Sequence, residues 1–175
     1  MSLRLARRSL GLAALACLAG CAGLATRPPA DLAGRLAVQI EAAAGQPARS
    51  FSAEFDLRGD ARSGQLRLTG PLGGTLADVR WEPGSAELTD AQGPRRYATL
   101  DAMTQDLFGE ALPLAAVIDW LRGRPWPGAP SRAAGDGFEQ LEWRVGLARF
   151  ADGVLEARRE RAPAVSLRAR LERPS

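Results

Sequence analysis

Hydrophobic and polar residues alternate with a period of two along much of the chain from residue 34 onward. Such a period places successive side chains on opposite faces of a β-strand, so the runs predict strands with one buried face. The apolar members are Leu36, Val38 and Ile40; Phe51, Ala53, Phe55 and Leu57; Leu66 and Leu68; Ala77, Val79 and Trp81; and Ala86 and Leu88. Short turns separate the runs and predict an antiparallel meander: Gly59-Asp60, Gly73-Gly74, Pro83-Gly84 and Gln92-Gly93.

The period changes near residue 101, where two short helices are predicted. Asp101 is the expected N-cap of the first helix, which Gly109 would end. The second is expected to begin at Pro113 and to end at Gly123. The apolar faces are Met103 and Leu107 in the first helix, and Leu114, Val117, Ile118 and Leu121 in the second.

Alternation returns after a proline-rich loop. We expect a strand over Leu141, Trp143 and Val145, a hairpin at Asp152-Gly153, and a last strand over Val165, Leu167, Ala169 and Leu171. The order is five or six strands, two helices, then three or four strands, which predicts an α+β fold. A curved sheet with helices over its opening encloses an apolar interior, which is either a filled core or a ligand cavity.

Residues 1–20 have the features of a secretory signal. Three arginines precede an uncharged apolar run from Leu10 to Ala19, which is shorter than the about 20 apolar residues that span a bilayer. The run leads into Leu18-Ala19-Gly20-Cys21, which matches the lipobox of lipoprotein signal peptidase. We expect cleavage before Cys21, with S-diacylglycerol and N-acyl groups such as palmitate added to that cysteine.

Cleavage would leave 155 of the 175 residues, which suits one domain. We place it at 34–175, after a lipid-anchored tether of residues 21–33. The signal holds three of the 23 basic residues and none of the 20 acidic ones, so the remainder is neutral and nucleic-acid binding loses its electrostatic support. Ala22, where inner-membrane lipoproteins have aspartate, favours export to the outer membrane.

The composition excludes much catalytic chemistry. The chain has no histidine, and all its basic residues are arginine. Histidine-dependent triads, Ser-Lys systems, Schiff bases and His-ligated zinc are therefore excluded for this chain alone. The acidic residues are scattered and are interpreted as a solvated face: Asp56, Asp60, Glu82, Glu87, Asp119, Glu139 and Glu142. We expect no enzyme and no metal or cofactor other than the covalent lipid.

One turn breaks the rule that turns are polar. Gly70-Pro71-Leu72-Gly73-Gly74 carries a large aliphatic residue at its tip. Leu72 either folds back onto the core or is an exposed apolar probe that meets a membrane or an acyl chain. The turn alone leaves both readings open.

Several segments are informative as a set: Leu66-Arg67-Leu68-Thr69-Gly70-Pro71-Leu72-Gly73, Pro83-Gly84 with Leu88, Leu112-Pro113-Leu114 and Trp120-Leu121-Arg122-Gly123. Together they resemble the LolB family of outer-membrane lipoprotein receptors. The resemblance covers most of the chain after the signal and is strongest between residues 64 and 123. The chain departs from the family pattern in having Gly64 and Gln65, and no aromatic residues, before Leu66.

The resemblance implies an incomplete, half-open antiparallel barrel with helices over an apolar cavity. Such a receptor accepts acylated lipoproteins from the periplasmic carrier LolA and inserts them into the outer membrane, and we expect it to be a monomer anchored on the periplasmic face. Leu72, between Pro71 and Gly73, matches the leucine that the family ties to membrane insertion. The expected acyl-chain cavity comprises Leu36, Val38, Phe55, Leu68, Val79, Trp81, Val117, Ile118 and Leu121.

Two rivals remain. A structural or assembly lipoprotein of the outer membrane would bind partner proteins, have a filled core and tolerate a polar residue at position 72. A carboxylate enzyme would need two acidic side chains converging in one cleft, which nothing in their spacing indicates.

Overall fold

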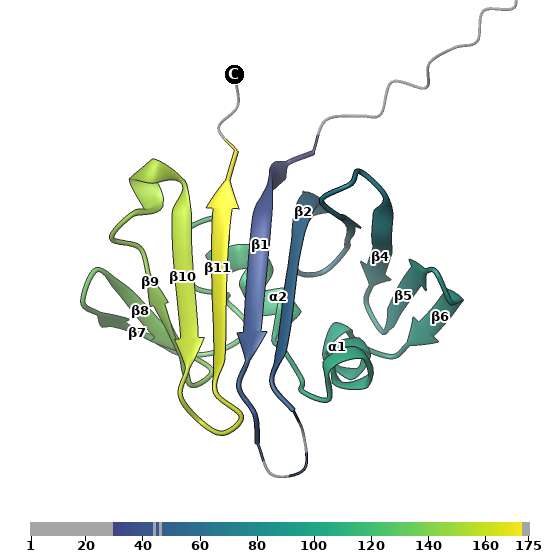
Figure 1. Cartoon of the computed structure of the whole chain (residues 1–175). Helices are drawn as coiled ribbons and strands as arrows, with labels where there is room; N and C mark the ends of the chain where they lie inside the picture. Colours follow the sequence, from purple (N-terminus) through teal and green to yellow (C-terminus); the bar gives the residue numbers. More distant parts are fainter. Residues whose placement is uncertain (1–29, 44, 46, 173–175) are drawn as a thin grey trace, which may run out of the picture.

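A computed structural model of the chain describes residues 30–43, 45 and 47–172 (Figure 1). These residues form eleven strands, two α-helices and one 3-10 turn, η1, at Phe150–Asp152. The strands before the helices are β1 Leu32–Ile40, β2 Arg49–Gly59, β3 Gly64–Thr69, β4 Thr75–Glu82, β5 Ser85–Asp90 and β6 Gly93–Tyr97. The helices α1 Leu100–Phe108 and α2 Leu114–Trp120 are followed by β7 Ser131–Ala134, β8 Gly137–Gln140, β9 Trp143–Gly146, β10 Val154–Arg159 and β11 Val165–Leu171.

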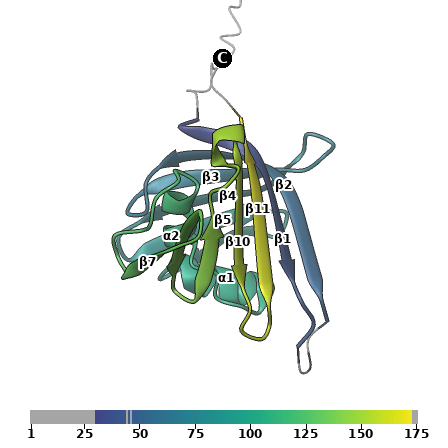
Figure 2. The same ribbon diagram turned by 90° about the vertical axis from the view of Figure 1, so that its left-hand side faces the viewer.

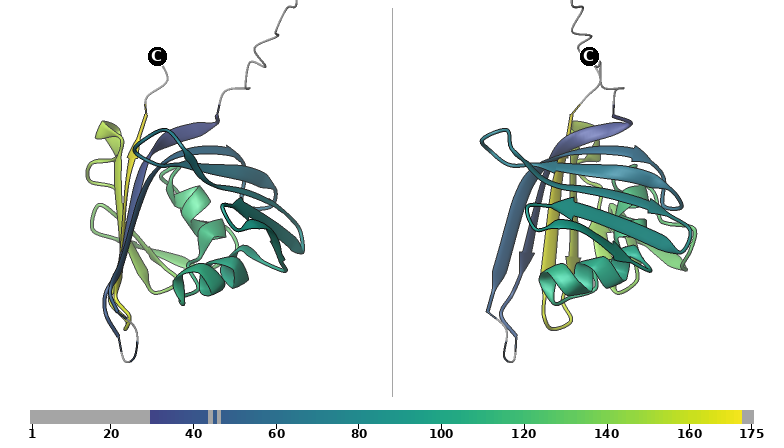
Figure 3. Two further views of the ribbon diagram at one scale, coloured as in Figure 1. Left: turned by 45° about the vertical axis from the view of Figure 1, so that its right-hand side comes forward. Right: turned by 90° about the vertical axis from the view of Figure 1, so that its right-hand side faces the viewer.

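All eleven strands belong to one antiparallel sheet in the order β6-β5-β4-β3-β2-β1-β11-β10-β9-β8-β7. The first and last strands of the chain pair at its centre, with Leu36 opposite Ala169 on one side and Ala53 on the other. The outermost strands β6 and β7 do not pair, so the barrel is open. The sheet curves around the two helices (Figures 2 and 3). The predicted antiparallel α+β fold is thus confirmed, and so is its open sheet.

The two helices differ in how deeply they are buried. In α1 only Leu100, Met103 and Thr104 are buried, whereas every residue of α2 from Ala116 to Trp120 is buried. Helix α1 therefore packs only one of its faces against the inner side of the sheet, whereas α2 lies within the core. None of the helices in the described part of the chain is long and apolar enough to cross a bilayer.

The helix boundaries correct three sequence predictions. The N-cap of α1 is Thr99, whose hydroxyl accepts a hydrogen bond from the backbone N–H of Ala102 at 3.0 Å, and Asp101 lies within the first turn. Gly109 ends the helix as predicted, because its φ of 69° is a left-handed conformation that glycine adopts without strain. Pro113, predicted as the first helical residue, is instead the N-cap of α2, which begins at Leu114. Helix α2 ends at Trp120 with Leu121 as its C-cap, and does not extend to Gly123 as predicted.

The second half of the sheet also differs from expectation. Five strands follow the helices instead of three or four, because β7 and β8 are only four residues long and carry few apolar residues. Leu141 does not lie in a strand. Leu141 and Glu142 form the turn between β8 and β9, and both have a positive φ (51° and 66°). The predicted strand over Leu141, Trp143 and Val145 therefore combined a turn residue with two residues of β9.

Gln140 organises the core around α2. Its amide oxygen accepts hydrogen bonds from Trp120 Nε1 at 2.8 Å and from the backbone N–H of Trp126, and its amide nitrogen donates to the carbonyls of Trp126 and Ala129. The buried amide is thus fully paired, which fixes the proline-rich loop against both α2 and β8.

Candidate functional site

The concave face of the sheet holds the predicted cavity residues. Val38, Phe55, Val79 and Trp81 are buried there, as are Val117 and Ile118 of α2 and Leu121, the C-cap of that helix. Leu36 and Leu68 also face inward but are only half-buried. Side chains of the sheet and the helices pack into one hydrophobic core. The structure therefore brings all nine residues to one face, where they are part of a packed core.

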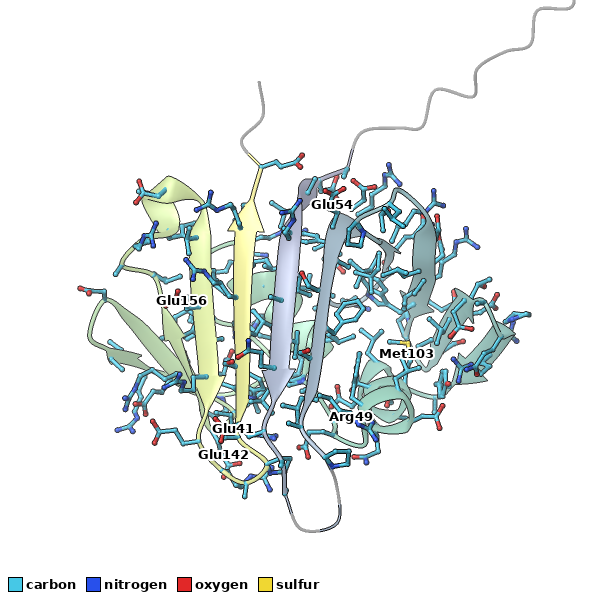
Figure 4. The ribbon with its side chains drawn as sticks, in the orientation of Figure 1. Glu41, Arg49, Glu54, Met103, Glu142 and Glu156 are labelled. Carbon is cyan, nitrogen blue, oxygen red and sulfur yellow. The ribbon has the colours of Figure 1, made fainter. Side chains whose placement is uncertain are left out.

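A hollow of about 780 Å³ lies on the opposite face of β1 and β9–β11. Its lining includes Gln39, Glu156, Arg158 and Arg168, which alternate along the strands with the inward residues. Figure 4 shows this division: Glu54 and Glu156 project from the outer face, whereas Met103 extends from α1 toward the inside. Because charged groups dominate this outer hollow, it does not suit acyl chains.

Half-buried apolar residues lie on the inner face of the first four strands and at the end of α1. Phe51 of β2 and Phe108 of α1 contact each other edge to face, with ring centroids 6.2 Å apart. Leu36, Leu68, Ala77 and Leu107 are also half-buried and pack on the core. Sequence reasoning missed Phe51 and Phe108 as site residues, although Phe51 shares the inward parity of Phe55.

Four polar contacts hold α1 and the segment after it. Asp106 accepts hydrogen bonds from the Tyr97 hydroxyl at 2.7 Å and from Arg95 at 3.4 Å. The hydrogen bond between Tyr97 and Asp106 raises the pKa of Tyr97. Thr104 accepts the backbone N–H of Leu112. Glu110 pairs at 2.7 Å with Arg159, whose side chain is almost fully buried. Since only Leu100, Met103 and Thr104 of α1 are buried, against every residue of α2 from Ala116 to Trp120, separating α1 from the sheet exposes less buried surface than removing α2 would.

The residues that follow helix α2 hold it in place, and one of them binds the last residue of β2, Gly59. Arg122 donates to the carbonyl oxygens of Ile118 and Gly59, at 2.9 and 2.7 Å. Asp119 is buried and pairs with Arg124 at 2.7 Å, which corrects its interpretation as part of a solvated face. A partner five residues along the chain compensates for the burial of this charge.

The tip of the β3–β4 hairpin is an exposed apolar surface. Hydrogen bonds of 2.9 Å from Gly70 N–H to the Gly74 carbonyl and from Gly73 N–H to the Gly70 carbonyl close the loop. Leu72 is 101% exposed and Leu76, at the foot of the loop, is 42% exposed. Leu72 therefore does not fold back on the core. Figures 2 and 3 show this loop projecting from the sheet, in the half of the molecule where β1 begins.

Asp78 strengthens the same hairpin on its outer face. Burial would raise the pKa of Asp78, but hydrogen bonds from Arg67 and Gln65, each at 2.8 Å, outweigh it, and the pKa lies below its ordinary value of 3.8. A carboxylate with a lowered pKa contributes stability above its unfolded-state pKa and loses that contribution as the pH falls through the folded-state value.

We expect Asp78→Asn to lower the free energy of unfolding by about 1 kcal/mol at pH 7. The difference from the wild type should shrink as the pH falls below about 4. Urea unfolding followed by circular dichroism between pH 7 and pH 3 measures it. Glu54→Gln, in an exposed pair with Arg35, is the control and should have little effect. A difference that stays constant down to pH 3 would contradict a charge-based contribution.

The positions of the acidic side chains decide whether they could hold a metal ion. In the ranges that the structure describes, no group of three or more His, Cys, Asp or Glu side chains is placed to hold a metal ion. Cys21 and the signal segment lie outside the described residues, so cleavage and lipidation stay predictions.

These features define a class: an open antiparallel barrel that packs helices into its concave apolar side and extends an exposed leucine on a hairpin. The sequence profile of a family described as "Outer membrane lipoprotein LolB" matches residues 30–162, and the chain belongs to this family of outer-membrane lipoproteins. The family's description names a lipoprotein and no enzymatic activity.

Individual relatives agree with the family match. The chain is similar to the outer-membrane lipoprotein LolB of Bordetella petrii, with 38% identity over 156 residues that cover 81% of this chain and 77% of the relative. The corresponding protein of Chromobacterium violaceum is 34% identical over 159 residues, which cover 83% of this chain and 84% of the relative. That of Ralstonia nicotianae is 42% identical over 95 residues, half of this chain.

Proposed function

We propose that this chain is an outer-membrane lipoprotein receptor, which accepts acylated lipoproteins from a LolA-like periplasmic carrier and inserts them into the outer membrane. The observation that carries the proposal is Leu72, a fully exposed leucine at the tip of a hairpin. The same domain also has an apolar concave face. An exposed leucine costs free energy in water and gains it in a bilayer.

Acyl chains need such a protein because water is a poor solvent for them. Burial of each CH2 is worth about 0.8 kcal/mol, so exposing three chains of roughly 16 carbons would cost some tens of kcal/mol. The receptor has to replace the bilayer with an apolar surface of its own. Transfer from carrier to receptor then needs no ATP, provided that the receptor binds the chains more favourably and that the membrane binds them better still.

The acyl chains would enter between α1 and strands β1–β4. In the described structure the concave face is packed, so binding requires α1 to move while α2 stays in place. This assignment follows from burial, since α1 buries only Leu100, Met103 and Thr104, whereas α2 is buried from Ala116 to Trp120. Movement of α1 would expose the half-buried Leu36 and Leu68, together with Phe51. The buried Val38, Phe55 and Val79 would form the floor of the site.

The proposed anchor fits the position of the loop. Residues 1–20 would be the signal, Cys21 the acylated residue, residues 21–33 the tether and residues 34–175 the domain, which would act as a monomer on the periplasmic face. Because the β3–β4 loop and the start of β1 lie in the same half of the molecule, a short tether would hold Leu72 close to the membrane (Figure 3).

Transfer of a radiolabelled lipoprotein from purified carrier tests the proposal. The receptor lacks residues 1–20, so that no acyl anchor is added, and this removes none of the described strands or helices. We expect the lipoprotein to leave the carrier and to elute with the receptor. Retention on the carrier at every receptor concentration would reject the receptor function.

The packed concave face also favours a second candidate, a structural or assembly lipoprotein that binds partner proteins without a lipid cavity. The unpaired edges of β6 and β7 offer it a place for strand addition. This candidate predicts no transfer from the carrier and no effect of a charge at position 72.

A further inference from the structure

The concave face has one ionisable pair beside its open edge. Arg95 lies on the edge strand β6 opposite Leu88, at an inward position, and its Nη2 contacts Asp90 Oδ2 at 2.5 Å. Most inward positions of the neighbouring strands β3, β4 and β5 are apolar. A charged pair at this position therefore needs a reason other than packing.

The guanidinium of Arg95 has an unused hydrogen-bond donor. Its Nε is buried and has no partner, and its Nη1 makes only a long contact of 3.4 Å with Asp106 on α1. A buried N–H without an acceptor costs free energy, and native structures contain few of them. Two donors of Arg95 are thus available to an added acceptor: the Nε–H, which has no partner, and the Nη1–H, whose bond to Asp106 is long.

A second arginine shows the same defect but in a closed environment. Arg159 Nε is also buried without a partner, yet the Arg159 side chain is only 3% exposed and is enclosed by Glu110, Pro163 and Trp143. The Arg95 side chain is 30% exposed, and that of Asp106, which covers it, is 55% exposed. A ligand can therefore reach Arg95 after a small shift of α1, whereas Arg159 stays closed.

A lipid-modified cysteine has the matching chemistry. Its acyl chains are joined to glycerol by esters and to the cysteine nitrogen by an amide, and all of these carbonyl oxygens only accept hydrogen bonds. They lose water when the chains enter an apolar site, so that they need a donor at its edge. Arginine supplies several donors in a rigid fork and has no acceptor.

We propose that Arg95, held in place by Asp90, binds the ester and amide carbonyl oxygens at the head of the acyl chains. This inference rests on the proposed function and places the polar head of the ligand at the β6 edge. The glyceryl esters of a phospholipid share this chemistry, and the experiment separates the two sources.

Binding to the protein without residues 1–20 is measured for three probes: a triacylated cysteine lipopeptide, a soluble short-chain phosphatidylethanolamine, and diphenylhexatriene, which has no polar head. We expect Arg95→Gln to weaken lipopeptide binding about tenfold, the loss of one charged hydrogen bond, and to leave diphenylhexatriene binding unchanged. A parallel loss for the phospholipid assigns the site to glyceryl esters, and a loss for the lipopeptide alone assigns it to the cysteine amides.

Arg96→Gln is the matched control, because Arg96 is adjacent on β6, faces outward and is 75% exposed. Asp106→Asn is the second variant, should Arg95→Gln fail to fold. It replaces the competing carboxylate by a neutral amide, whose oxygen is a weaker acceptor for Arg95, and should raise the affinity for the lipopeptide relative to diphenylhexatriene. If the wild type binds all probes and neither variant changes this ratio, Arg95 is only an inward charge that protects an edge strand, and the inference is overturned. If the wild type binds neither the lipopeptide nor diphenylhexatriene, the proposed function itself fails.

Discussion

Leu72→Glu should leave the fold intact and abolish delivery of lipoproteins into a bilayer. The Leu72 side chain is fully exposed, so its replacement should change the free energy of unfolding by less than about 0.5 kcal/mol. A carboxylate in place of the leucine cannot enter the hydrocarbon region without a cost of several kcal/mol, which corresponds to at least a hundredfold loss of insertion. The variant should still accept lipoproteins from the carrier.

The measurement is release of the receptor-bound lipoprotein into liposomes, separated by flotation. Leu141→Glu is a suitable control, because Leu141 is also an exposed leucine in a hairpin turn but lies between β8 and β9. We expect Leu141→Glu to release its cargo like the wild type. Equal release by Leu72→Glu and the wild type would show that the β3–β4 loop has no part in insertion.

Trp120→Ala should destabilise the domain by about 3–5 kcal/mol. Trp120 is completely buried, packs against the rings of Phe138 and Trp143, and donates its indole N–H to Gln140. Truncation leaves a cavity and removes one of the two hydrogen bonds to the Gln140 amide oxygen, which keeps the bond from the backbone N–H of Trp126. Urea unfolding of the soluble domain measures the loss.

Trp120→Phe isolates mainly the hydrogen bond, since it removes the indole N–H and keeps an aromatic ring in place of the larger indole. It should cost about 1–2 kcal/mol. A loss below about 1 kcal/mol for Trp120→Ala would mean that α2 is a loosely attached cover, and it would then be a candidate for the moving element instead of α1.

The period-two pattern predicted the inward face of most strands because one side of this sheet is buried. It could not predict β6, whose residues Gly93–Tyr97 include a proline and two arginines and are held in place by pairing with β5. The turn at Leu141 was also missed, since positive φ is unusual for leucine and no glycine or asparagine marks the turn.

The charged members of the site were beyond sequence reasoning for a different reason. Alternation assigns an arginine to the solvated face, but Arg159 is buried by an ion pair with Glu110, which lies 49 residues earlier. Arg95 is likewise turned inward beside Asp90 and Asp106. Such pairings depend on how strands and helices meet in space. The exposure of Leu72, which the sequence left open, follows from the closed backbone of its five-residue loop.

Site-specific photocrosslinking tests most directly whether the concave face takes the acyl chains. Benzoylphenylalanine replaces Phe51, which faces inward beside α1, or Ser52, the next residue, which faces outward on the same strand. The receptor is then loaded from the carrier with a lipoprotein carrying radiolabelled acyl chains and irradiated. We predict that position 51 crosslinks to the labelled chains and that position 52 does not. Efficient loading with no crosslink from position 51, or with equal crosslinks from both positions, would contradict an acyl site on the concave face.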